Sequence, residues 1–137
     1  MKKIILPISF LVLLLVNSSC RQEYKPQDSD FPADDPQAYR QHSAFIWQYA
    51  ARYGSQMHES ITLNLAKGQA QKSGLKLIDG LESWNEPDKW WRGREGYFHP
   101  FECAAMLSAD FDGHAGPLGP LYGLKQADPN LDFVMGG

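Results

Sequence analysis

The strongest constraint on the fold of this chain is a strand–helix–strand pattern in its second half. Residues 75–83 read LKLIDGLES, whose aliphatic side chains predict a short buried strand with Gly80 as a possible bulge. Residues 100–111, PFECAAMLSADF, predict a helix that ends before a glycine-rich stretch. Residues 131–135, LDFVM, predict a second strand after the turn signal ADPN. Two strands joined through a helix form a βαβ unit, so we expect an α/β fold with parallel strands and a right-handed crossover.

Another helix is predicted before this unit. Asp35 offers an N-cap oxygen, and Pro36 suits the first helical position. Apolar residues then recur at helical spacing until Gly54, namely Phe45, Ile46, Tyr49, Ala50 and Tyr53. Residues 55–74 show no sustained period, which predicts an irregular connection.

Residues 1–19 have the features of an export signal. Lys2 and Lys3 precede an apolar run that is too short for a comfortable membrane span, and small polar residues follow it. The end of this segment, VNSSC, resembles the lipobox of bacterial lipoproteins, although Asn17 stands where that family has Leu or Val. The resemblance implies cleavage before Cys20 and acylation of its thiol. A plain cleaved signal or a retained anchor is the alternative.

The same resemblance bears on location. Asp directly after the cysteine favours inner-membrane retention in lipoproteins, and Arg21 stands there instead. We therefore expect an exported protein held by a lipid anchor at the outer membrane or cell surface, or otherwise a periplasmic one. Residues 20–35 are polar, acidic and proline-bearing, which predicts a disordered tether to a domain of residues 36–137.

Composition excludes several kinds of partner. The net charge is −3 and becomes more negative if the signal is removed, which argues against nucleic acid. The glycines and prolines of residues 113–123 match no phosphate-binding motif, and no His–Cys spacing supports a metal site, so no cofactor and no metal are expected. Cys103 is expected to be a buried free thiol.

The segment ESWNEPDKWW, residues 82–91, directly follows the first predicted strand and mixes carboxylates with three indoles. Ligand sites combine such groups, because aromatic walls supply contact area and a few polar groups fix orientation. A strand that ends in WNEP resembles the clan A glycoside hydrolases, retaining enzymes built on a (β/α)8 barrel. Their fourth strand ends in Asn-Glu-Pro or a close variant. The likeness also covers AARYG before the motif and ADPNLDFVMGG after it, and so most of the chain after Asp35.

This resemblance implies roles for individual residues. Glu86 corresponds to the general acid/base, and Asn85 to a hydrogen-bond partner of the sugar 2-hydroxyl. Trp84, Trp90 and Trp91 are candidates for stacking on sugar faces, or else they pack the loop against its neighbours. A general acid must be protonated near neutral pH, which burial and a neighbouring carboxylate achieve. In the simplest structural alternative, Glu86 only faces water.

The resemblance also limits what the chain is expected to do. Retaining enzymes need a second carboxylate about 5–5.5 Å from the first, and in this clan it belongs to the seventh strand. A (β/α)8 barrel typically takes about 250 residues. We therefore expect a partial TIM barrel of about two parallel strands with flanking helices, a fragment of a hydrolase of O-glycosidic bonds that is inactive as this chain. The alternatives are a non-catalytic glycan-binding surface lipoprotein and a structural lipoprotein with no ligand.

Overall fold

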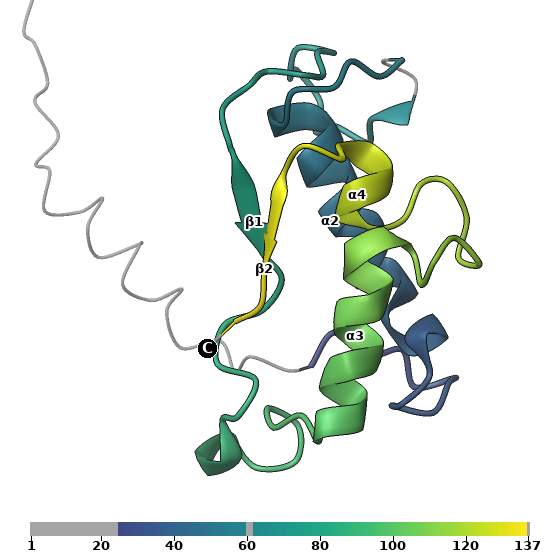
Figure 1. Cartoon of the computed structure of the whole chain (residues 1–137), viewed down its shortest axis with the longest axis vertical. Coiled ribbons are helices and arrows are strands. Elements are labelled where there is room, and N and C mark those ends of the chain that lie inside the picture. The colour runs from purple at the N-terminus through teal and green to yellow at the C-terminus, as the bar shows by residue number, and fades with distance from the viewer. Residues whose placement is uncertain (1–24, 60–61, 137) are drawn as a thin grey trace, which may run out of the picture.

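The computed structural model describes residues 25–59 and 62–136 (Figure 1). Within these ranges the elements in chain order are η1 (Pro36–Tyr39), α2 (Arg40–Tyr53), β1 (Gly80–Glu82), η3 (Trp90–Arg92), α3 (Pro100–Asp112), α4 (Leu124–Ala127) and β2 (Asp132–Val134). The predicted export signal and Cys20 lie outside the described residues.

The first predicted helix is confirmed, with a 3-10 turn at its start. The Asp35 side chain accepts a hydrogen bond from the Gln37 backbone N–H, so it caps η1 as its position predicted. The helix continues as α2 and ends at Gly54. A Cβ at Gly54 would lie 2.6 Å from both the Ala50 carbonyl oxygen and an oxygen of Asp128, so this close crossing requires glycine.

The two predicted strands pair in parallel, as expected, but each is only three residues long. Gly80 pairs with Asp132, Leu81 with Phe133 and Glu82 with Val134. The prediction of a bulge at Gly80 is wrong, because this residue is in regular register. Glycine is needed for space instead, since a Cβ there would lie 3.0 Å from the Asp132 carbonyl oxygen.

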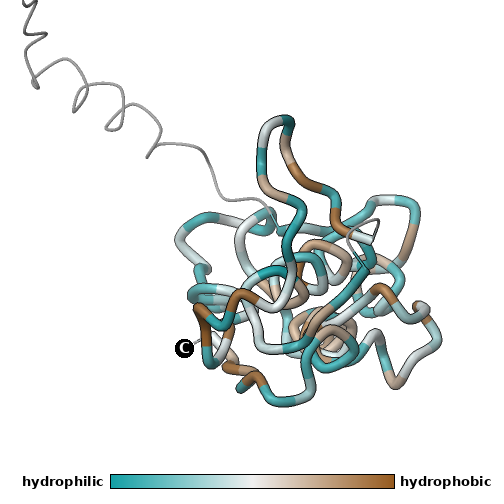
Figure 2. The backbone as a smooth tube through the Cα atoms, turned by 90° about the horizontal axis from the view of Figure 1, so that it is seen from above, coloured by the Kyte–Doolittle hydropathy of each residue, from teal (hydrophilic) through white to brown (hydrophobic). Residues whose placement is uncertain are grey.

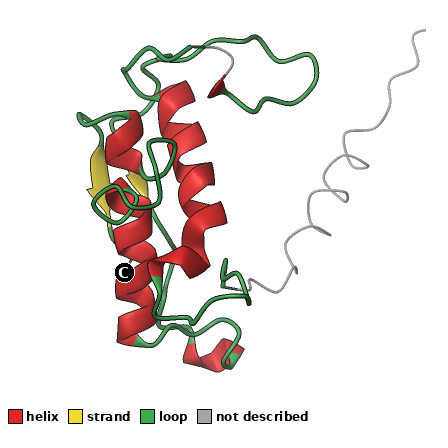
Figure 3. Cartoon of the chain, turned by 90° about the vertical axis from the view of Figure 1, so that its right-hand side faces the viewer, coloured by secondary structure: helices red, strands yellow, loops and turns green. Residues whose placement is uncertain are grey.

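The helix α3 is confirmed within one residue of its predicted end, and Gly113 closes it in the left-handed conformation. Helices α2, α3 and α4 lie on one side of the strand pair (Figures 1 and 3). The paired residues Leu81 and Phe133 pack toward the helices, whereas Glu82 and Val134 on the other side of the strands are exposed.

Among the described residues, two hydrophobic clusters form the core. The first joins α2 and α4 to the strands and comprises Ile46, Trp47, Ala50, Ala51, Leu63, Leu124, Ala127 and Leu131. The second joins η1 to α3 and comprises Ala38, Tyr39, Phe98, Ala105, Met106, Ala109 and Leu118. Figure 2 shows that hydrophobic residues also occur on peripheral segments of the chain, which agrees with the high exposure of several aromatic side chains.

Residues 25–35, which composition predicted to be part of a tether, lie against the folded body. The Lys25 backbone N–H donates to the Glu95 carbonyl oxygen at 2.9 Å, and that of Asp28 donates to the Ala38 carbonyl oxygen at 2.7 Å. The buried Tyr39 hydroxyl donates to the Ala33 carbonyl oxygen at 2.8 Å. Backbone hydrogen bonds of this kind do not depend on apolar composition, so the polarity of the segment did not predict its packing.

Candidate functional site

The WNEP motif lies at the carboxyl end of the parallel strand pair, as the strand predicted over residues 75–83 implied. The Ser83 backbone N–H donates to the Val134 carbonyl oxygen at 3.1 Å, so the chain remains beside β2 as it leaves β1. A Cβ at Gly136 would collide with the Trp84 carbonyl oxygen. The loop then reaches η3 and returns to α3, and it is closed by a hydrogen bond of 2.9 Å from the Phe98 N–H to the Pro87 carbonyl oxygen. We call residues 84–98 the WNEP loop.

Glu86 has an unusual backbone and a solvated side chain. Its φ of 51° is in the left-handed region, which non-glycine residues seldom adopt. The side chain is 47% exposed, and its Oε2 lies 3.8 Å from Nζ of Lys89. The burial expected of a general acid is therefore not found at Glu86, whose carboxylate is half exposed beside an ammonium group.

Trp90 and Trp91 present indole surface to solvent. They are 74% and 55% exposed and meet each other edge to face, with 5.9 Å between ring centroids. Both belong to η3, which ends at Gly93 with a positive φ of 71°. Asn85 is exposed as well. The middle of the WNEP loop therefore carries accessible aromatic and polar groups together.

Trp84 is placed differently from the other two indoles. Its ring meets His42 at 5.7 Å and Phe98 at 5.8 Å between centroids, edge to face in both cases. Its Nε1 is buried and has no hydrogen-bond partner within the described residues. These contacts pack Trp84 against the second core cluster, so it holds the start of the loop in place.

His42, which contacts the Trp84 ring, is also part of a buried polar network. Asp110 of α3 is fully buried, and its carboxylate contacts His42 Nδ1 at 2.9 and 3.1 Å. The Ser83 hydroxyl donates to the same carboxylate at 2.5 Å. Burial of a carboxylate is costly unless it is paired and hydrogen-bonded. The network thus joins α2, α3 and the end of β1 at the point where the WNEP loop begins.

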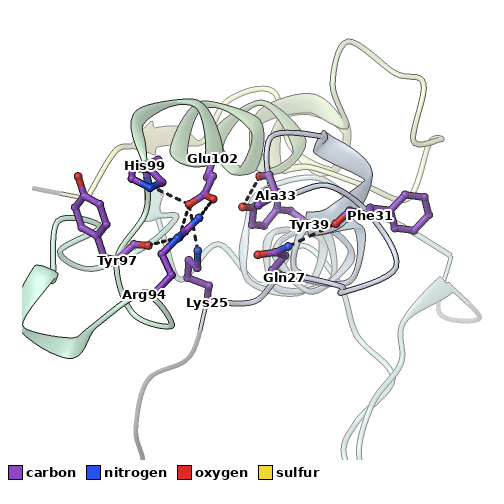
Figure 4. Close-up of polar contacts among 9 residues, drawn as sticks. All are labelled: Lys25, Gln27, Phe31, Ala33, Tyr39, Arg94, Tyr97, His99 and Glu102. Carbon is purple, nitrogen blue, oxygen red and sulfur yellow. Dashed lines mark hydrogen bonds and ion pairs between the residues drawn. The ribbon is translucent and has the colours of Figure 1, made fainter.

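A second buried carboxylate, Glu102, fixes the other end of the loop (Figure 4). Its oxygens accept hydrogen bonds from Lys25 Nζ at 3.1 Å, from the His99 backbone N–H at 2.9 Å and from the guanidinium of Arg94. Burial by itself raises the pKa of Glu102, but the bonds from Arg94, His99 and Lys25 outweigh it and lower the pKa to about 2. Burial, followed by the charge of Glu102, raises the pKa of Tyr39.

A third buried carboxylate, Asp128, lies away from the WNEP loop. It accepts bonds from the backbone and hydroxyl of Ser55 and from the backbone of Gln56 and Asn130. Burial raises its pKa, and these hydrogen bonds reverse the effect and lower it. The carboxylate links the residues that follow α2 to the turn before β2, so its role is structural.

The remaining predicted features concern the metal, the thiol and the membrane. No cluster of three or more His, Cys, Asp or Glu side chains that could hold a metal occurs in residues 25–59 and 62–136. Cys103 is free and only partly buried, and burial raises the pKa of its thiol. None of the helices in the described part of the chain has the length and apolarity to cross a bilayer.

Sequence reasoning found the loop but missed the groups that hold it. His42 and Asp110 are 68 positions apart and gave no spacing signal. Asp110 is one of two acidic residues on the helix predicted over residues 100–111, beside Glu102, and only the packing of α2 against α3 shows that it pairs with His42. Comparisons with known proteins add nothing to this description, because no family model, curated protein or solved structure matches the chain.

Proposed function

We propose that this chain carries the acid/base segment of a retaining glycoside hydrolase. The observation that supports it is the position of residues 84–87 at the carboxyl end of two parallel strands joined through a helix. Active sites of (β/α)8 enzymes are built at this end. In this proposal β1 and β2 correspond to the fourth and fifth strands, Glu86 is the acid/base, and Asn85 bonds the sugar 2-hydroxyl.

The polypeptide by itself is not expected to turn over glycosides. Three of the carboxylates that follow Glu86 are buried and bound to other groups, namely Glu102, Asp110 and Asp128. None of these three is available to attack an anomeric carbon. Positioned acid catalysis without a nucleophile typically contributes only about 10²–10⁴-fold, which is too little for the slow hydrolysis of an acetal.

The experiment is an assay of the full-length chain on aryl glycosides of several sugars, beside the Glu86→Gln variant. We expect background rates for both proteins. If the wild type hydrolyses a glycoside and Glu86→Gln does not, the result would support Glu86 as the acid/base. It would also contradict the expectation that the chain is inactive by itself. DNA flanking the reading frame supplies the second test, because a hydrolase segment should be bordered by sequence for further barrel strands, and its absence would exclude the hydrolase proposal.

A second candidate function is glycan binding without turnover, by a surface lipoprotein. It is favoured by the exposure of Trp90 and Trp91 and by the solvated carboxylate of Glu86. Exposed indoles are suited to stacking on the C–H faces of sugars. Retention on a panel of immobilised polysaccharides separates this function from a structural lipoprotein without a ligand, since the latter should elute from every matrix.

The proposed attachment to the membrane is tested separately. Cys20 is expected to incorporate radiolabelled palmitate in a bacterial host, and Cys20→Ser to abolish the label. Cys103→Ser is the matched control, since Cys103 is partly buried on α3 and should not affect labelling. Equal labelling of wild type and Cys20→Ser would exclude the lipoprotein assignment.

A further inference from the structure

Helix α2 turns an aromatic face away from the core. Ile46, Trp47, Ala50 and Ala51 are buried, whereas Phe45 is 60% and Tyr49 36% exposed. Phe45, Tyr49 and Tyr53 follow one another at a spacing of four residues, so they form a row along one face of the helix. Their ring centroids are 6.1 Å and 4.6 Å apart. We call these three residues the α2 ladder.

Residues 62–70 form a wall opposite this ladder and are fastened to the same helix. Gln48 uses both ends of its amide, donating to the Thr62 carbonyl oxygen at 2.7 Å and accepting from the Asn64 N–H at 2.8 Å. Arg52 donates to the Ala70 carbonyl oxygen at 3.0 Å. Figure 3 shows this irregular connection passing over the end of the helix. Side-chain hydrogen bonds therefore hold residues 62–70 beside α2 in the absence of a ligand.

The groove between ladder and wall has a volume of about 450 Å³. Besides the rings it is lined by the apolar side chains of Ala44 and Leu65 and by exposed amide side chains, those of Gln41, Asn64 and Gln69. Arg52 is the one charged residue among the described residues that line it, and its guanidinium lies 5.5 Å from the Tyr53 ring centroid. Aromatic faces beside uncharged hydrogen-bonding groups suit a neutral ligand that is apolar on its faces and rich in hydroxyls at its edges.

We propose that this groove binds an extended, uncharged glycan chain, at a site separate from the WNEP loop. Phe45 and Tyr53 are eight positions apart, which corresponds to about 12 Å along the helix axis, so the ladder is longer than a single sugar ring. The site does not depend on the proposed hydrolase segment. It would serve equally to hold a polysaccharide beside that segment or to bind glycan without turnover.

An apolar protein segment is the competing occupant, and the amides on both sides of the groove argue against it. Such a segment would cover the Gln41, Asn64 and Gln69 amides without offering them partners, and unpaired buried polar groups are costly. Glycan hydroxyls can both donate to and accept from amides. The three exposed amides that line the groove therefore favour a glycan.

The test titrates the full-length chain, in detergent, with cellohexaose, xylohexaose and mannohexaose. Binding is followed by calorimetry and by the side-chain amide NMR signals of Gln41, Asn64 and Gln69. We expect at least one hexasaccharide to shift these signals. Tyr49→Ala should weaken that binding about tenfold, because it removes the central ring of the ladder, whereas Tyr49→Phe should retain it within about threefold.

Trp90→Ala is the control that separates the two proposals. It should leave the groove signals and their titration unchanged, even if it abolishes binding at the WNEP loop. The groove proposal is overturned if no hexasaccharide shifts the amide signals, or if Tyr49→Ala binds as tightly as wild type. It is also overturned if the chain self-associates and Tyr49→Ala alone makes it monomeric, since the ladder would then be a protein interface.

Discussion

The two ends of the WNEP loop and its middle are built in opposite ways. Ser83, directly before the loop, is fixed by the fully buried carboxylate of Asp110, and Trp84 at its start by two aromatic rings. The end of the loop is fixed by Glu102. In the middle of the loop, by contrast, the side chains of Glu86, Trp90 and Trp91 are about half exposed or more. Rigid supports with an exposed centre are typical of loops whose side chains serve a ligand. The comparison predicts that stability depends on the ends of the loop and binding on its middle.

The largest effect is expected at Asp110. Asp110→Ala leaves His42 and Ser83 without their buried partner, and breaking a buried pair typically costs about 3–5 kcal/mol of unfolding free energy. Urea unfolding of the variant measures this loss. Asp88→Ala, an exposed carboxylate in the middle of the loop, is the control and should change stability by less than about 0.5 kcal/mol. Equal stability losses in the two variants would remove the distinction between the ends and the middle.

The tryptophans offer the next test, because the same change can be made in both regions. Trp84→Ala removes a ring packed against His42 and Phe98 and should cost about 2–3 kcal/mol, below the range for a fully buried ring. Trp90→Ala removes a ring that is 74% exposed and should be close to neutral. Denaturant midpoints at constant slope measure both. A larger loss for Trp90→Ala would show that η3 packs more tightly than its exposure indicates.

The end of the loop should respond to acid. The folded-state pKa of Glu102 is about 2, below the ordinary value of 4.5, so its charged form stabilises the folded chain above pH 4.5. This contribution, about 2–3 kcal/mol, is lost as the pH falls from 4.5 toward 2. Unfolding free energies of wild type and Glu102→Gln should converge over that interval. Parallel curves would indicate that Lys25 and Arg94 do not stabilise the charged carboxylate.

Local signals in the sequence predicted the regular elements. Helical spacing and caps located α2 and α3, and two aliphatic runs located the parallel strands, since these features act over a few residues. The strands are shorter than predicted, because hydrophobic character alone does not show where a partner strand ends. The helical spacing predicts one apolar face that includes Phe45, Tyr49 and Tyr53, but the face of α2 that fills the core carries Ile46, Trp47, Ala50 and Ala51.

The sequence predicted the motif of the candidate site but not the buried groups that hold the motif in place. The sequence WNEP after a strand located Asn85 and Glu86, but the pairing of Asp110 with His42 depends on how two helices cross. Residues 25–35 show the same limit, since their backbone hydrogen bonds depend on the position of the helical body. Contacts between distant segments require the fold to be known, and nothing in the local residue types specifies them.

The smallest effect, and the sharpest test of the exposed middle, is expected at Glu86. Its left-handed backbone is disfavoured for any residue with a Cβ, so Glu86→Gly should leave stability unchanged or raise it by up to about 1 kcal/mol. Glu86→Gln keeps the Cβ and removes only the contact with Lys89 at 3.8 Å, and a half-exposed ion pair contributes at most about 1 kcal/mol. If Glu86→Gly is the more stable variant by urea unfolding, the chain retains a strained glutamate that its folding does not need, which is expected of a side chain kept for a ligand. If Glu86→Gly is instead markedly less stable than Glu86→Gln, the residue supports the loop, and the exposed middle would be structural like the ends.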